Sequence, residues 1–93
     1  MVVGVLQVEI RLPNSHSLKE KRWTVKSIVT RLRNKFNVSV SETDEQDKWQ
    51  LATLVIAHIG NGQTFSNQIL DQALNFVLEI RQIEVIDSKL EFI

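Results

Sequence analysis

The chain contains no cysteine, and this excludes several kinds of site at once. Without thiols there is no disulfide framework, no thiol nucleophile and no thiolate metal site, which fits a reducing compartment. Three glycines and one proline occur in 93 residues, and neither a Gly-x-Ser-x-Gly turn nor a phosphate-cradling glycine loop is present. The N-terminal residues lack a secretion signal, and no apolar run reaches the roughly 18–20 residues that span a bilayer. We therefore expect a soluble, cytoplasmic protein that makes no membrane contact.

The sequence also lacks a catalytic constellation. His16 and His58 fall in different predicted elements and do not have the spacing of a metal-binding pair. One loop contains several acidic residues, which are Glu42, Asp44, Glu45 and Asp47. This loop lacks the glycine and the later glutamate of an EF-hand. We interpret the acidic residues as a solvated acidic hairpin; pairing with the basic helix of a second subunit, or a divalent cation, are the alternatives. We expect no enzymatic activity, metal, cofactor or small-molecule substrate.

Hydrophobic periodicity predicts four strands and two helices. A period of two predicts strands at residues 2–12 and 38–42. A segment that is apolar on both faces predicts a central strand at residues 49–59, and a last strand is expected at residues 83–92. A period near 3.6 predicts helices from Ser17 to Phe36 and from about Phe65 to Ile80. Ser17 with Glu20 three residues later forms a capping-box pattern, and Thr64 is the candidate N-cap of the second helix. The order is β-α-β-β-α-β.

This order predicts a single α+β domain over residues 1–93 with a ferredoxin-like fold. Such a fold has a four-stranded antiparallel sheet with both helices on one face. Its first and third strands are central, and here these two are the longest and most apolar strands. The fold itself does not define a function, because it hosts many unrelated ones.

Two apolar surfaces suggest self-association. The third strand is apolar on both faces, so one apolar row points away from the helices. Leu70, Leu74 and Leu78 form a second row, shifted from the helical stripe that we predict to be buried, which is Phe65, Ile69, Ala73, Phe76, Val77 and Ile80. These rows reflect either a wide core face with ordinary surface apolar residues or a homodimer interface.

The positive charge is concentrated in the first third of the chain. Residues 1–35 hold eight of the eleven Lys and Arg against two acidic side chains, a net charge of +6, whereas residues 36–93 carry −6. The chain as a whole is neutral. An uneven distribution of this kind favours an anionic partner for the positive side.

One stripe of the first helix is the candidate binding surface. It consists of Lys19, Arg22, Lys26 and Arg33, and Trp23 falls in the same sector. The cations would meet RNA phosphates, Arg11 would add to them, and Trp23 could stack on a base. In the alternative, the stripe is a solvated face and the Lys and Arg stems cover the indole. The Gly-aromatic signature of RNA-recognition motifs is absent, which directs any RNA to the helix side or a loop.

Several segments resemble the YlxP-like family of small bacterial proteins, a domain of unknown function. They are Leu12 to Arg22, Val25 to Ser27, Arg33 to Val40, Glu42 to Asp44, Asp47 to Trp49 and Ala52 to Leu54. The resemblance implies a ferredoxin-like fold and a bacterial, cytoplasmic protein. Genes of the family often lie beside those for translation initiation factor two and ribosome-binding factor A. Where this chain has Trp23, the family is expected to have a basic or small residue.

Two functional hypotheses follow. In the first, the protein binds RNA or a ribosomal subunit through Arg11, Lys19, Arg22, Lys26 and Arg33, in translation or RNA metabolism. In the second, it is a homodimeric protein-interaction module without a nucleic-acid role. The two are compatible, because a symmetric dimer would present the basic surface twice.

Overall fold

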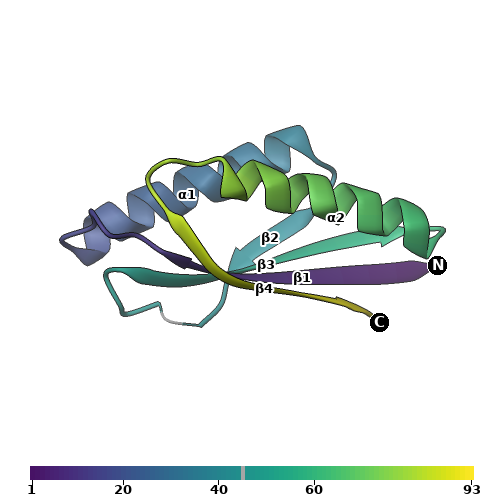
Figure 1. The fold of residues 1–93 in the computed structure, drawn as a ribbon, viewed down its shortest axis with the longest axis horizontal. Helices are drawn as coiled ribbons and strands as arrows, with labels where there is room; N and C mark the ends of the chain where they lie inside the picture. The colour runs from purple at the N-terminus through teal and green to yellow at the C-terminus, as the bar shows by residue number, and fades with distance from the viewer. Residues whose placement is uncertain (45) are drawn as a thin grey trace.

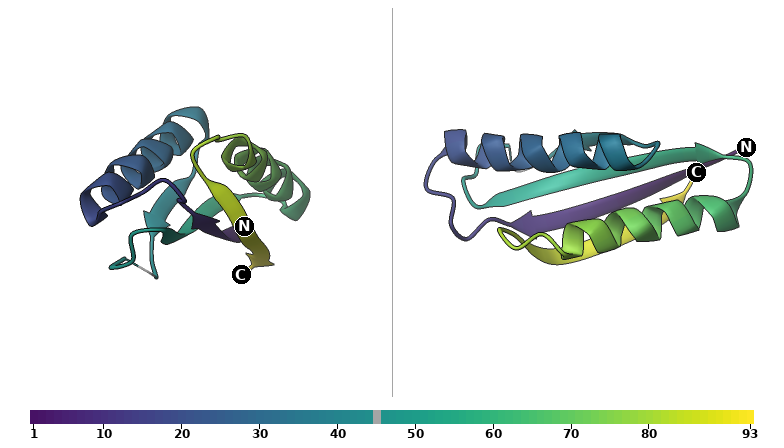
Figure 2. Two further views of the ribbon diagram at one scale, coloured as in Figure 1. Left: turned by 60° about the vertical axis from the view of Figure 1, so that its left-hand side comes forward. Right: turned by 90° about the horizontal axis from the view of Figure 1, so that it is seen from above.

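The computed structural model, which describes residues 1–44 and 46–93, has the predicted order of elements. These are β1 (Val2–Arg11), α1 (Leu18–Lys35), β2 (Ser39–Glu42), β3 (Leu51–Gly60), α2 (Gln63–Leu78) and β4 (Glu84–Phe92). The strands form one antiparallel sheet in the order β2-β3-β1-β4. Both helices lie side by side on one face of this sheet (Figures 1 and 2). The predicted ferredoxin-like α+β fold, with β1 and β3 central, is confirmed.

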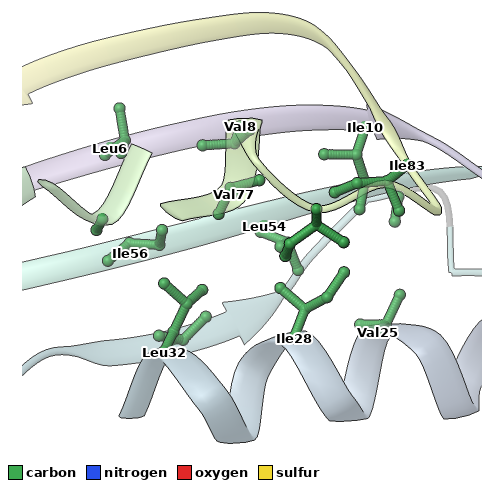
Figure 3. Packing of buried hydrophobic residues seen from close by; sticks show 14 of the residues in the cluster. Leu6, Val8, Ile10, Val25, Ile28, Leu32, Leu54, Ile56, Val77 and Ile83 are labelled. Atoms are coloured by element: carbon green, nitrogen blue, oxygen red, sulfur yellow. The ribbon is translucent and has the colours of Figure 1, made fainter. Parts of the chain in front are cut away.

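The core forms between the helices and one face of the central strands, as alternation in β1 predicts. Leu6, Val8 and Ile10 of β1 are buried, while the intervening Gln7 and Glu9 are exposed. Their buried partners in Figure 3 come from the other elements: Leu54, Ile56, Val25, Ile28, Leu32, Val77 and Ile83. Each fully buried aliphatic side chain contributes about 1.5–3 kcal/mol relative to exposure, so this layer dominates the stability of the fold.

The start of α1 shows why the helix begins where it does. Ser17 Oγ accepts the Glu20 backbone N–H at 3.1 Å, which is one half of the predicted capping box. The Glu20 carboxylate returns to the backbone N–H of His16 at 2.8 Å, one residue before the cap. Two N–H groups that the helix itself leaves unbonded are thereby satisfied.

The second helix corrects two predictions and supports the wide core face for the leucine row. Helix α2 begins at Gln63 with Gly62 at its N-cap, so Thr64 lies inside the helix and does not cap it. Phe65, predicted to be buried, is 56% exposed. Leu70 is only 1% exposed and Leu74 packs against the core, as a wide core face predicts, so only Leu78 of the leucine row is a surface residue.

A polar residue explains the shift of the buried stripe in α2. Ser66 is fully buried, and its hydroxyl lies 2.8 Å from Nδ1 of the buried His58 of β3. This hydrogen bond lets a serine occupy an inward helical position next to Leu70 and Ala73. A periodicity that counts apolar residues alone misses such a position. No helix of the described residues is long and apolar enough to cross a membrane.

The sheet face opposite the helices carries the apolar row that the sequence predicted for β3. Val55 and Ala57 are half-buried on this face, and Ile59 is exposed. The register of β1 and β3 pairs Val5 with Ala57 and Val3 with Ile59, so the row continues onto β1. Strand β4 forms one edge of the sheet and contains a bulge opposite Glu9 and Ile10. Beyond the bulge, it pairs regularly with β1 from Asp87 to Phe92.

Candidate nucleic-acid interface

Helix α1 presents a strongly basic outer surface, because its aliphatic stripe faces the core. Val25, Ile28 and Leu32 are buried beneath it. The exposed charged side chains of α1 comprise one acid, Glu20, and six cations, which are Lys19, Arg22, Lys26, Arg31, Arg33 and Lys35. Their sum is +5 on a helix of 18 residues. The positive half of the molecule is therefore a single exposed helix rather than charge spread over the whole surface.

Four of the predicted site residues lie together on the N-terminal half of α1. Lys19, Arg22 and Lys26 are exposed, and Trp23 among them is 70% exposed. The Nζ atom of Lys19 lies 5.6 Å from the centre of the Trp23 ring, within the range of a cation–π contact. This contact keeps a cation beside the indole and leaves most of the side chain accessible. The cluster therefore offers both positive charge and an aromatic surface.

The structure separates the other two predicted residues from this cluster. Arg33 is exposed, but its Nη2 donates a hydrogen bond of 2.7 Å to the Val40 carbonyl, which ties the end of α1 to β2. Arg11 lies in β1 on the sheet face away from the helices, with Nη1 3.6 Å from a Glu84 carboxylate oxygen. Both of these side chains are more than half exposed, so the pair is weak. Arg11 does not extend the surface of α1.

Two further cations extend the surface at the other end of α1. The guanidinium carbon of Arg31 lies 5.7 Å from the ring centre of Phe76 in α2, and Nζ of Lys35 lies 5.3 Å from it. The Phe76 ring meets Phe36 edge-to-face, with their centres 6.3 Å apart. Arg31 and Lys35 were not among the predicted site residues, although their spacing of four places them on one helix face. Positive charge therefore runs along the whole helix.

Lys21 is the basic residue of α1 that does not contribute to this surface. Its side chain is completely buried, and Nζ lies 2.9 Å from Oε2 of Glu42 at the end of β2. Glu42 is 18% exposed, so it does not belong to the solvated acidic hairpin that the sequence suggested. The other members of that group, Asp44 and Asp47, are exposed, and Glu45 lies outside the described residues. The Lys21–Glu42 ion pair joins α1 to β2 inside the molecule.

Comparison with known proteins places this small ferredoxin-like protein in a family. Residues 3–90 match the family described as "Protein of unknown function (DUF503)". The chain is similar to "Uncharacterized protein YlxP" of Bacillus subtilis (strain 168), with 37% identity over 83 residues that cover 89% of this chain and 90% of that protein. The chain therefore belongs to the DUF503 family, as the resemblance in its sequence implied.

A solved structure supports the fold. The chain is similar to "De novo designed protein Foldit4" with a TM-score of 0.52, covering 98% of this chain and 93% of the designed one. The two sequences are 15% identical, so the likeness concerns the arrangement of helices and strands.

Proposed function

We propose that this protein is a non-enzymatic, cytoplasmic binding protein that binds RNA or a ribosomal subunit through the exposed side of α1. The observation that carries the proposal is the charge of that side, six exposed cations and one acid. The buried Lys21–Glu42 pair does not change this surface charge, because the two side chains have opposite charges and lie next to each other inside the fold. Apart from Lys21, the core side of the helix is apolar, so all of the excess charge faces outwards.

The chemistry of the cluster suits a phosphate backbone. Lysine and arginine side chains that meet phosphates release condensed counterions, which makes binding favourable and dependent on salt. Lys19, Arg22 and Lys26 recur at spacings of three and four, so their side chains follow one side of the helix. Trp23 lies within this row and offers a π-face to an unpaired base. Such a combination is typical of surfaces that bind nucleic acid with modest sequence preference.

The direct test is binding to ribosomal subunits and to total RNA at two salt concentrations. We expect saturable binding that is strongly weakened in the Lys19→Ala/Arg22→Ala/Lys26→Ala variant. The matched control compares Arg22→Ala with Arg81→Ala, which removes the same charge from the exposed turn between α2 and β4. Binding weakened only by Arg22→Ala would locate the interface on α1. Equal effects of the two substitutions, or full binding by the triple variant, would contradict the proposal.

The edge of the sheet favours a second candidate function, a homodimer through β4. Its regular part allows a symmetric antiparallel pairing with a second copy, centred on Leu90. Lys89 and Glu91 both lie on the outer sheet face. In this pairing, Lys89 of one copy lies opposite Glu91 of the second copy, and Glu91 of the first lies opposite Lys89 of the second. Leu90 would meet its own counterpart on the helix side of the sheet. Registers centred on Lys89 or Asp87 place like charges opposite each other.

Sedimentation of charge-exchanged variants tests this dimer. Glu91→Lys would place a lysine opposite Lys89 at both symmetry-related positions of the dimer. The double variant Lys89→Glu/Glu91→Lys exchanges the two charges, so each pair again has opposite signs. We expect the wild type and the double variant to dimerise more strongly than the single variant. A wild type that stays monomeric at all concentrations would contradict the dimer and leave the RNA proposal intact.

A further inference from the structure

Both tryptophans of the chain are exposed, and they lie near the same end of the molecule. Trp23 is 70% exposed on α1, and Trp49 is 54% exposed just before β3. The turn that leads into α1 and the loop that leads into β3 are both at the left of Figure 1. Tryptophan usually buries most of its large ring, so two exposed rings on segments at one end of the molecule favour a contact surface there.

Hydrogen bonds join the segment that bears Trp49 to the turn that precedes α1. Gln50, the neighbour of Trp49, donates from Nε2 to the Pro13 carbonyl at 3.3 Å and to the Ser15 carbonyl at 3.1 Å. The backbone N–H of Leu12 donates to the Gln50 carbonyl at 2.9 Å. The segment of residues 11–15 is therefore held against the segment of Trp49 and leads into α1, the helix that bears Trp23.

A hollow lies beside each ring, and the segment of residues 11–15 contributes to both. The first hollow has a volume of about 220 Å³, and Trp23 lines it with Asn14, Thr24 and Gln82. The second has a volume of about 470 Å³, and Trp49 lines it with Arg11 and Lys48. Each also has a carboxylate in its lining, which is Glu20 in the first and Asp47 in the second.

This combination suits nucleobases better than phosphates. A carboxylate repels a phosphate but accepts hydrogen bonds from the amino groups of cytosine, adenine and guanine. The amides of Asn14 and Gln82 provide both donors and acceptors to a base edge. The ring of each tryptophan provides the stacking surface. The phosphates would be met instead by Lys19, Arg22 and Lys26 on α1, beside the first hollow.

We propose that the two hollows bind two unpaired bases of one RNA strand, one base stacked on Trp23 and the other on Trp49. This inference rests on the proposed RNA binding and makes it specific for single strands. A duplex keeps its bases stacked on one another and cannot offer them to the indoles. The duplex would contact only the cations of α1 and would bind more weakly.

Single-tryptophan variants provide the test, because the chain has only two tryptophans. In Trp23→Phe the fluorescence comes from Trp49 alone, and in Trp49→Phe it comes from Trp23 alone. Each variant is titrated with a mixed-sequence 12-nucleotide RNA strand and with the duplex formed from it and its complement. We expect the single strand to quench both signals and the duplex to quench neither. Quenching of only one signal, or equal quenching by the duplex, would overturn the two-base site.

Affinity gives an independent readout. Base stacking on an aromatic side chain is worth about 1–3 kcal/mol, so Trp23→Ala and Trp49→Ala should each weaken single-strand binding roughly 5- to 150-fold. Phe65→Ala is the control, since Phe65 is an exposed aromatic residue, 56% against 54% for Trp49, and lies at the start of α2, near the other end of β3. Full affinity in both tryptophan variants would refute this inference while sparing the α1 interface. Absence of any RNA binding by the wild type would refute both.

Discussion

Replacing Lys21 by Met tests the one charged residue that is completely buried among residues 1–44 and 46–93. Methionine keeps the length of the stem and fills the same space, so the cavity cost is small. The loss is the ammonium group that lies 2.9 Å from Glu42 Oε2. Breaking a buried ion pair costs about 3–5 kcal/mol, and the remaining exposure of Glu42 lets water offset part of this. We expect a loss of about 2–3 kcal/mol out of a total stability of roughly 5–14 kcal/mol.

Urea denaturation at neutral pH measures this change directly. With a slope of about 1–1.5 kcal/mol per molar urea, the midpoint should fall by about 1.3–3 M. The companion variant Lys21→Met/Glu42→Gln replaces the carboxylate by a neutral group of the same shape and should recover at least ~1 kcal/mol. The cycle of single and double variants isolates the coupling between these two residues from the other interactions of Lys21.

An exposed lysine of the same helix serves as the control for this experiment. Lys26→Met should change the free energy of unfolding by less than about 0.5 kcal/mol, because Lys26 is on the outer side of α1. A Lys21→Met variant as stable as Lys26→Met would show that the ion pair does not stabilise the junction of α1 and β2.

Three further changes have predictable effects on stability, all measured by urea denaturation. Leu32→Ala leaves a cavity at a fully buried site and should lower the free energy of unfolding by about 2–5 kcal/mol. Leu78→Ala, at an exposed site of α2, should lower it by less than about 1 kcal/mol. Equal losses in the two variants would contradict the assignment of the core face. Ser17→Ala removes the N-cap of α1 and should cost about 1 kcal/mol, and no loss would mean that the cap is dispensable. Ser66→Ala deprives the buried His58 of its hydrogen bond and should cost about 1–3 kcal/mol, while an unchanged midpoint would show that His58 finds another partner.

The fold was predictable from the sequence because local patterns and topology agree. Alternation in β1, the apolar β3 and the Ser17–Glu20 cap each indicate the same arrangement that the structure shows. The register of α2 was not predictable from apolar periodicity, since the helix is apolar over a wide arc and Ser66 occupies an inward position. Its hydrogen bond to His58 becomes visible only when β3 and α2 are placed together.

The candidate site was predictable in part. Lys19, Arg22, Trp23 and Lys26 could be grouped by helical spacing alone, because they belong to one helix. Arg11 lies apart from them, and the alternation of β1 already carried the signal, because Arg11 falls on the strand face opposite to the buried Ile10. The burial of Lys21 and the proximity of the Trp49 loop to α1 depend on contacts between distant segments, Glu42 with Lys21 and Gln50 with Ser15. Composition and periodicity carry no signal for such contacts.

The salt dependence of RNA affinity tests the central claim, that the outer side of α1 is the binding surface. The logarithm of the association constant is plotted against the logarithm of the salt concentration for the wild type and for the Lys19→Ala/Arg22→Ala/Lys26→Ala variant. Each lost phosphate contact lowers the slope by about 0.7 for a single strand, so the variant should be shallower by about 2. The same slope for both proteins would show that these residues do not contact RNA, and the account would be contradicted.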